Sequence, residues 1–148
     1  MNIHIFIIFL IFSFLGAVME HVSYYIDNTL FNSAPRILSN PILAGFPLYG
    51  CCGLLIWYVY DKFLQNCNYV LLFFIFAILI TTIEYIVGIN VGAGKTTPGG
   101  IDSWDYSDQS FNYKGIISLK HFIAWGLLGL IVINIYPILY DKISLMKL

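Results

Sequence analysis

The sequence predicts an all-α fold, a polytopic transmembrane bundle with about four spanning helices and one long polar loop between the third and fourth. Three observations lead to this fold class. Hydrophobic residues make up 59% of the 148 positions, and the mean hydropathy is +0.83. Only 10% of the residues are charged, whereas a soluble domain carries about 25%. Four apolar segments have the length of roughly 20 residues that a helix needs to cross a bilayer.

The four predicted helices form a single transmembrane domain that includes the whole chain, residues 1–148. They cover residues 3–26, 42–60, 69–88 and 116–136. The first has no charged residue before Glu20, and it lacks a basic start and an Ala-x-Ala cleavage site. We therefore expect a retained helix rather than a signal peptide. The second ends at Asp61-Lys62, the third contains one acid, Glu84, and the fourth runs into a proline.

The connections between the helices predict the topology. Residues 61–68 form a short link, so the second and third helices should be antiparallel. Residues 27–40 and the polar loop, residues 90–114, are longer and contain prolines. With four crossings, both termini and the short link lie on one side of the membrane, and both long loops lie on the other. Lys and Arg are about equally numerous on the two sides, so the positive-inside rule leaves the orientation open.

Two acids lie near the loop ends of their helices. An acid at the centre of a membrane helix costs about 2.5–3.5 kcal/mol on insertion scales, and it usually faces the bundle interior or a wet cavity. Glu20 shares a helix face with Gly16, and Glu84 shares one with Gly88, which permits close helix approach. The acids either bind an ion, a proton or a substrate, or they are structural. The structural alternatives are an acid in interfacial water or a buried pair. The partners considered for that pair are Lys120, His121 and Arg36.

The start of the fourth helix carries a polar and aromatic stripe. The residues spaced i, i+4, i+7 and i+11 are Lys114, Ser118, His121 and Trp125. Lys120 is offset from this stripe and is expected to extend to the interface. Gly126 and Gly129 are predicted to be positions of close helix packing.

Several motifs in the chain resemble known sites without matching them. Three acids at i, i+3 and i+6 in the polar loop, beginning at Asp102, lack the spacing of an EF-hand. Gly94-Lys95-Thr96 lacks the first glycine of a phosphate-binding loop, because position 89 is Ile. The three cysteines are read as small apolar packing residues. No cofactor, metal ligand set or catalytic residue is predicted, and the net charge of −1 gives no basic surface for nucleic acid.

The polar loop is expected to be ordered and to cover the helix ends. In this loop, Trp104, Tyr106 and Phe111 should pack against the helix ends, and the polar side chains should form hydrogen bonds with the backbone. All the unusual polar residues then lie at one membrane face. The candidate substrate- or ion-binding residues at this face are Glu20, Tyr49, Glu84, Asp105, Tyr106, Asn112 and Lys120.

A series of motifs in this order resembles a known family. The motifs are Gly16-x-x-x-Glu20-x-x-x-Tyr24, Gly45-Phe46-Pro47-Leu48-Tyr49-Gly50, Thr82-Ile83-Glu84-Tyr85, Trp104-Asp105-Tyr106-Ser107, Phe111-Asn112-Tyr113-Lys114-Gly115, Trp125-Gly126 and Tyr136-Pro137. They are similar to the bacterial membrane family labelled as ABC-transporter permeases of the CmpB-like or "type IV" group. The similarity extends over residues 16–139. It implies an integral, multi-pass membrane protein with a role in transport.

Three functions are compatible with these observations. The first is a transporter or permease component, which would require a second copy or a partner subunit in the lipid bilayer because four helices make a small permease. The second is a structural or accessory membrane protein whose polar groups hold the bundle together. The third is a membrane-embedded enzyme that acts on a lipid, with Glu20, Glu84 and Asp105 as acid, base or metal ligand.

Overall fold

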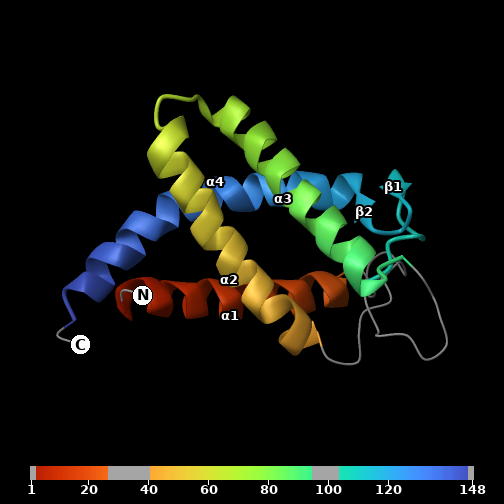
Figure 1. Cartoon of the computed structure of the whole chain (residues 1–148), viewed down its shortest axis with the longest axis horizontal. Helices are drawn as coiled ribbons and strands as arrows, with labels where there is room; N and C mark the ends of the chain where they lie inside the picture. Colours follow the sequence, from red (N-terminus) through yellow and green to blue (C-terminus); the bar gives the residue numbers. More distant parts are fainter. Residues whose placement is uncertain (1–2, 27–40, 95–103, 147–148) are drawn as a thin grey trace.

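A computed structural model describes residues 3–26, 41–94 and 104–146, without the side chains of Tyr24 and residues 41–46. This part of the chain is mostly helical (Figure 1). Its elements in order are α1 (Ile3–Ile26), α2 (Pro41–Val59), the π-helical turn η2 (Tyr60–Leu64), α3 (Tyr69–Val91), β1 (Asn112–Tyr113), β2 (Ile117–Ser118) and α4 (Leu119–Ser144). Both termini lie at one end of the molecule, and the two strands lie at the opposite end.

Three of these helices are long and apolar enough to cross a membrane. The qualifying segments are Ile3–Ser23, Tyr69–Val91 and Leu119–Ser144, with mean hydropathies of 2.3, 2.6 and 2.1. Large apolar side chains on their outer faces are exposed, among them Phe14, Ile78 and Ile131, as expected where lipid surrounds a helix. The chain is therefore a helical membrane protein. The predicted helix over residues 42–60 also forms, as α2, and its crossing stays a prediction.

The predicted bounds of the fourth helix, residues 116–136, are wrong at both ends. The chain forms β2 before the helix, and α4 begins at Leu119 because the Ser118 side chain accepts a hydrogen bond from the His121 amide. A serine in extended conformation is a favourable N-cap. At the other end, α4 continues through Pro137 to Ser144. Membrane helices tolerate an internal proline because their surroundings can satisfy the freed carbonyl.

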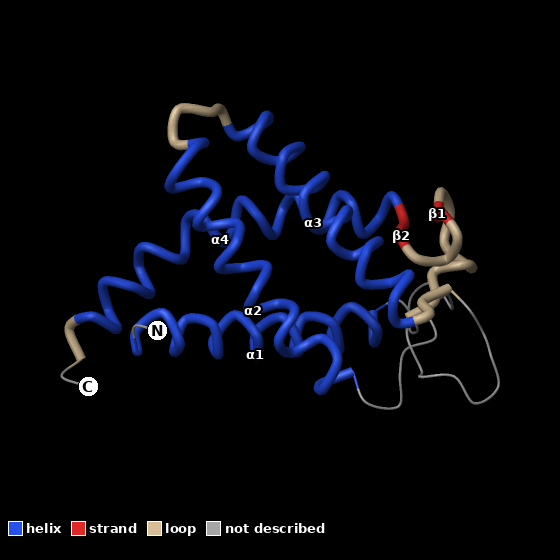
Figure 2. The backbone as a smooth tube through the Cα atoms, in the orientation of Figure 1, coloured by secondary structure: helices blue, strands red, loops and turns tan. Residues whose placement is uncertain are grey.

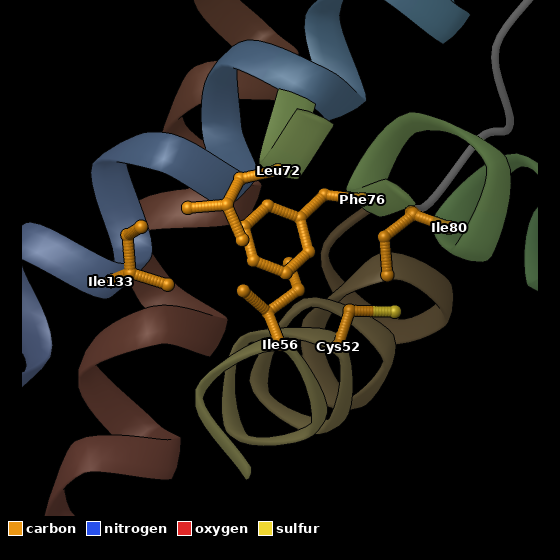
Figure 3. Close-up of a cluster of buried hydrophobic side chains, with 6 residues drawn as sticks. All are labelled: Cys52, Ile56, Leu72, Phe76, Ile80 and Ile133. Carbon is orange, nitrogen blue, oxygen red and sulfur yellow. The ribbon is translucent and has the colours of Figure 1, made fainter. Parts of the chain in front are cut away.

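Helices α2 and α3 follow one another closely along the chain. The link between them contains η2 and ends at Asn68, whose side chain caps α3 by accepting from the Leu71 amide at 2.9 Å. Figure 2 shows the two helices diverging from this turn, with α4 behind them. Side chains of all three helices meet in one apolar cluster, which we call the Phe76 core. Its members are Cys52, Ile56, Leu72, Phe76, Ile80 and Ile133 (Figure 3).

Glycines set the distances between the helices. A Cβ atom on Gly126 would lie 2.5 Å from the Phe73 ring, and one on Gly129 would lie 2.5 Å from Phe76. The prediction that both are close-packing positions of α4 is confirmed. Gly16 packs against Tyr49 in the same way, which brings α1 close to α2. Small residues of this kind let membrane helices approach through backbone contact.

A small hairpin that was not predicted lies where the polar loop meets α4, within residues 112–118. β1 and β2 are antiparallel, and Lys114 and Gly115 between them have φ values of 56° and 66°. Positive φ values at both central residues are what a type I′ turn requires, and the Ile116 amide donates to the Tyr113 carbonyl across the turn at 3.1 Å. Tyr106 is buried and Trp104 is half-buried, as expected. The prediction that Phe111 packs onto the helix ends is wrong, because its side chain is 82% exposed. Its backbone has a positive φ of 55°, and its carbonyl accepts a hydrogen bond from the Leu119 amide.

Candidate functional site

Glu84 is a buried acid within α3, with only 5% of its surface exposed. Both of its carboxylate oxygens accept hydrogen bonds from other segments. The Tyr106 hydroxyl donates to Oε1 at 3.1 Å, and the indole Nε1 of Trp125 donates to Oε2 at 2.9 Å. Glu84 thereby joins α3 to the polar loop and to α4. Because its donors are neutral, they stabilise the carboxylate without cancelling its charge.

A second acid lies beside this arrangement. Glu20 of α1 accepts a hydrogen bond from the Tyr49 hydroxyl of α2. The Tyr49 ring packs against the Trp125 ring, with 5.8 Å between centroids. Glu20 and Glu84 are close enough to repel each other when both are ionised. We call these five residues, Glu20, Tyr49, Glu84, Tyr106 and Trp125, the carboxylate cluster.

Tyr106 is held in a neutral state. Burial and the adjacent Glu84 carboxylate raise the pKa of its phenol well above the ordinary value, which is about 10. Its ring stacks on the ring of His121, with 3.9 Å between centroids and 14° between planes. It therefore remains a hydrogen-bond donor to Glu84 at physiological pH.

The start of α4 anchors the polar loop next to the carboxylate cluster. Nδ1 of His121 lies 2.8 Å from the Ser118 hydroxyl, which donates to the Gln109 side-chain oxygen at 2.8 Å. The predicted stripe is thus correct for Ser118, His121 and Trp125. It is wrong for Lys114, because the hairpin turn places this residue before the helix, with its ammonium 3.5 Å from the Tyr85 hydroxyl.

The structure brings together four of the seven predicted candidates: Glu20, Tyr49, Glu84 and Tyr106. Trp125 was absent from that set. The signal that could have included it was its position on the helix-four stripe, one turn after His121. Lys120 lies on the first turn of α4 and is exposed.

Asp105 and Asn112 have local roles in the loop. Asp105 Oδ1 accepts from the Ser107 amide at 2.9 Å and from its hydroxyl at 2.5 Å. The Asn112 side chain donates to the Gln109 carbonyl and accepts from the Gly115 amide. Such short-range bonds are typical of Asp and Asn in turns.

Some sequence features fall outside the described residues, namely Arg36, Lys95, Thr96 and Asp102. Within residues 3–26, 41–94 and 104–146, no three His, Cys, Asp or Glu side chains are placed to hold a metal ion.

An apolar cavity of about 90 Å³ adjoins the carboxylate cluster. Its walls come mainly from α1, α2 and α4, with Ile80 contributed by α3. Tyr49 and Trp125 line it and also belong to the cluster. One end of the cavity therefore meets the two aromatic residues that bind the acids.

The comparison with known families identifies the chain. The family model described as "Putative ABC-transporter type IV" matches residues 7–147. The chain belongs to this family. The match confirms the resemblance drawn from the sequence motifs, and the family name suggests an ABC-transporter type of membrane protein. No curated protein and no solved structure is significantly similar to the chain.

Proposed function

We propose that the chain is a four-span subunit of a membrane transporter, and that the carboxylate cluster is its proton- or cation-binding site. The observation that carries this proposal is Glu84. It is a buried acid in a membrane helix, and its carboxylate accepts hydrogen bonds from Tyr106 and Trp125, both of them neutral.

The chemistry of two adjacent acids supports a binding role. A buried carboxylate in a membrane is costly unless it is neutralised or paired. Glu84 and Glu20 add to this cost by repelling each other. A proton or a cation between them relieves both effects. Because the two ligands relieve the same charge, they compete, and such competition is the basis of coupled exchange.

The origin of the cluster residues supports coupling to a conformational change. They come from α1, α2, α3, the polar loop and α4. A shift of one helix against another would alter the hydrogen bonds to the acids, and thereby their affinity for the ligand. By linkage, ligand binding would bias the helix arrangement to the same extent. A second copy or a partner subunit would complete the pathway, since one chain has few helices.

Proton release upon addition of a cation tests this function. Purified full-length protein in weakly buffered detergent is titrated with tetraethylammonium chloride, and a pH-sensitive dye reports the released protons. Wild-type protein should release protons in a saturable way, and Glu84→Gln should release far fewer because one competing acid is lost. Asp141→Asn, at an exposed acid on α4, is the matched control and should behave like wild type.

The outcome for Glu84→Gln decides the test. Equal release from this variant and from wild type would reject the binding role. Glu20→Gln is measured in parallel, so that poor folding of one variant does not end the experiment. Each variant is first compared with wild type by its Trp fluorescence and its elution in detergent.

A structural role is the second candidate, and one observation favours it. The bonds of Glu84 hold the polar loop and α4 to α3. If this is the whole role, Glu84→Gln lowers stability in detergent and wild-type protein releases no protons with tetraethylammonium. The lipid-enzyme alternative has less support, because the Asp105 carboxylate is engaged by Ser107 in its own turn.

A further inference from the structure

The apolar cavity offers a second binding region next to the carboxylate cluster. Its lining includes Cys52, Ile56 and Val132, and Tyr49 and Trp125 connect it to the acids. An apolar cavity of this kind stays dry, and it suits an apolar ligand. Its volume of about 90 Å³ is below the 150 Å³ or so of an engineered cavity that binds benzene. It therefore suits part of one narrow hydrocarbon chain and excludes a two-chain lipid.

The cavity is also accessible from the hydrocarbon side. Met19 of α1 and Ile131 and Ile135 of α4 line it, and these side chains are 42%, 50% and 37% exposed. All three lie on helices that are apolar enough to span the membrane. A hydrocarbon chain in the bilayer could thus enter between α1 and α4 without crossing a polar layer.

The charge of the ligand is selected by the two acids of the carboxylate cluster, which lie behind Tyr49 and Trp125 and are not part of the cavity lining. The two carboxylates repel a phosphate or carboxylate headgroup, and they attract an ammonium group. The aromatic rings of Tyr49 and Trp125 add to this preference, because cations are attracted to the faces of such rings. Acids combined with aromatic rings are the groups expected around a bound amine.

The geometry points to a binding site for a single-chain amphiphile with an amine headgroup. The hydrocarbon chain occupies the cavity between α1, α2 and α4, and the ammonium lies at Tyr49 and Trp125, the two members of the carboxylate cluster that line the cavity. The inference rests on the proposed cation-binding function and adds the ligand class, a lipophilic amine. The shape of the cavity selects a single hydrocarbon chain, and the carboxylate cluster selects the charge of the headgroup.

Native mass spectrometry of the full-length protein in detergent tests the inference, with dodecylamine as the probe and dodecanoic acid as the anionic comparison. Wild type should bind one molecule of dodecylamine. Its affinity for dodecanoic acid should be about tenfold lower, which corresponds to about 1.4 kcal/mol in binding free energy. Val132→Phe enlarges a side chain in the cavity and should lower dodecylamine binding about tenfold. Val70→Phe, the same change at an exposed position of α3, should leave binding unchanged.

A second pair of variants covers the case in which Val132→Phe folds poorly. Ile135→Trp blocks the opening of the cavity, and Ile138→Trp is its control on the same helix, with an exposed side chain outside the lining. The first should reduce dodecylamine binding and the second should not. Equal binding by both cavity variants and their controls would overturn the inference, as would equal binding of dodecylamine and dodecanoic acid.

The outcomes separate this inference from the proposed function. If Glu84→Gln abolishes proton release while the cavity variants keep full dodecylamine binding, the acid site stands and the cavity assignment fails. If a second copy of the chain fills the cavity instead, wild type appears as a dimer that binds no dodecylamine, and Val132→Phe weakens that dimer. This result also overturns the inference.

Discussion

The Phe76 core and the carboxylate cluster both join α2, α3 and α4, but they do so by different interactions. In the Phe76 core, six small or apolar side chains fill the space between the helices. In the carboxylate cluster, Glu84 joins three segments through two hydrogen bonds, and a second acid lies close by. The first arrangement depends on shape, and the second depends on charge and on exact donor positions.

The difference in cost between the two regions supports the proposed binding role of the carboxylate cluster. In lipid, apolar burial gives little driving force between helices, so tight packing contributes most of their association. The Phe76 core provides such packing at low cost. The carboxylate cluster places a buried acid, Glu84, beside a half-buried acid, Glu20, although apolar residues could fill the same space. Acids are costly inside a membrane bundle, so they are expected mainly where they bind a ligand.

Removing the Phe76 ring should have the largest effect on stability. Phe76→Ala deletes a fully buried ring and should lower the free energy of unfolding by about 3 kcal/mol. Phe74→Ala is the matched control, because the Phe74 side chain is exposed on the lipid-facing side of α3. Unfolding in mixed micelles with increasing dodecyl sulfate, followed by Trp fluorescence, measures both. Similar losses from the two variants would mean that the Phe76 core does not hold the helices together.

Removing the Tyr106 hydroxyl should have a smaller effect, and one that depends on pH. Tyr106→Phe removes a hydrogen bond to Glu84 and should cost about 1–2 kcal/mol. The folded state also raises the pKa of the phenol above its unfolded value. The unfolded chain therefore loses this proton first, near pH 10, and the stability of wild type falls as the pH rises above that value.

The pH dependence of stability shows whether the Tyr106 hydroxyl acts as a buried neutral donor. Tyr106→Phe should show a shallower loss of stability between about pH 9.5 and 11 than wild type. Tyr69→Phe removes an exposed tyrosine at the start of α3 and is the matched control against which the slope of Tyr106→Phe is compared. If Tyr106→Phe and wild type lose stability in parallel over this range, Tyr106 is not a buried neutral donor.

The helices were predictable from the sequence because lipid imposes a simple rule on composition and length. The acids were also predictable as unusual residues, since few groups cost more inside a membrane. Their partners were not, because Tyr106 and Trp125 lie 22 and 41 residues from Glu84 along the chain. Pairs at such separations depend on how the helices pack, which hydropathy does not encode.

The polar loop and the start of α4 show a second feature that hydropathy does not predict, namely local turn structure. Ile116 and Ile117 are apolar and continue directly into a helix, so the hydropathy pattern placed them in it. The structure instead pairs Ile117 with Tyr113 across the turn at Lys114 and Gly115. The cue was Gly115 in a position that requires a positive φ. Asp105 and Asn112 were assigned to the site by their polarity, although local hydrogen bonds use both side chains.

Replacing Asp105 should have the smallest effect and would sharpen the boundary of the site. In Asp105→Asn the side-chain oxygen can still accept from the Ser107 amide, so stability should change by less than about 0.5 kcal/mol. Proton release with tetraethylammonium should also equal that of wild type, because Asp105 lies outside the carboxylate cluster. Asp105→Ala, which removes the acceptor, should cost about 1 kcal/mol by loosening the turn. If Asp105→Asn abolishes proton release while keeping wild-type stability, the binding site must extend from the cluster into the polar loop.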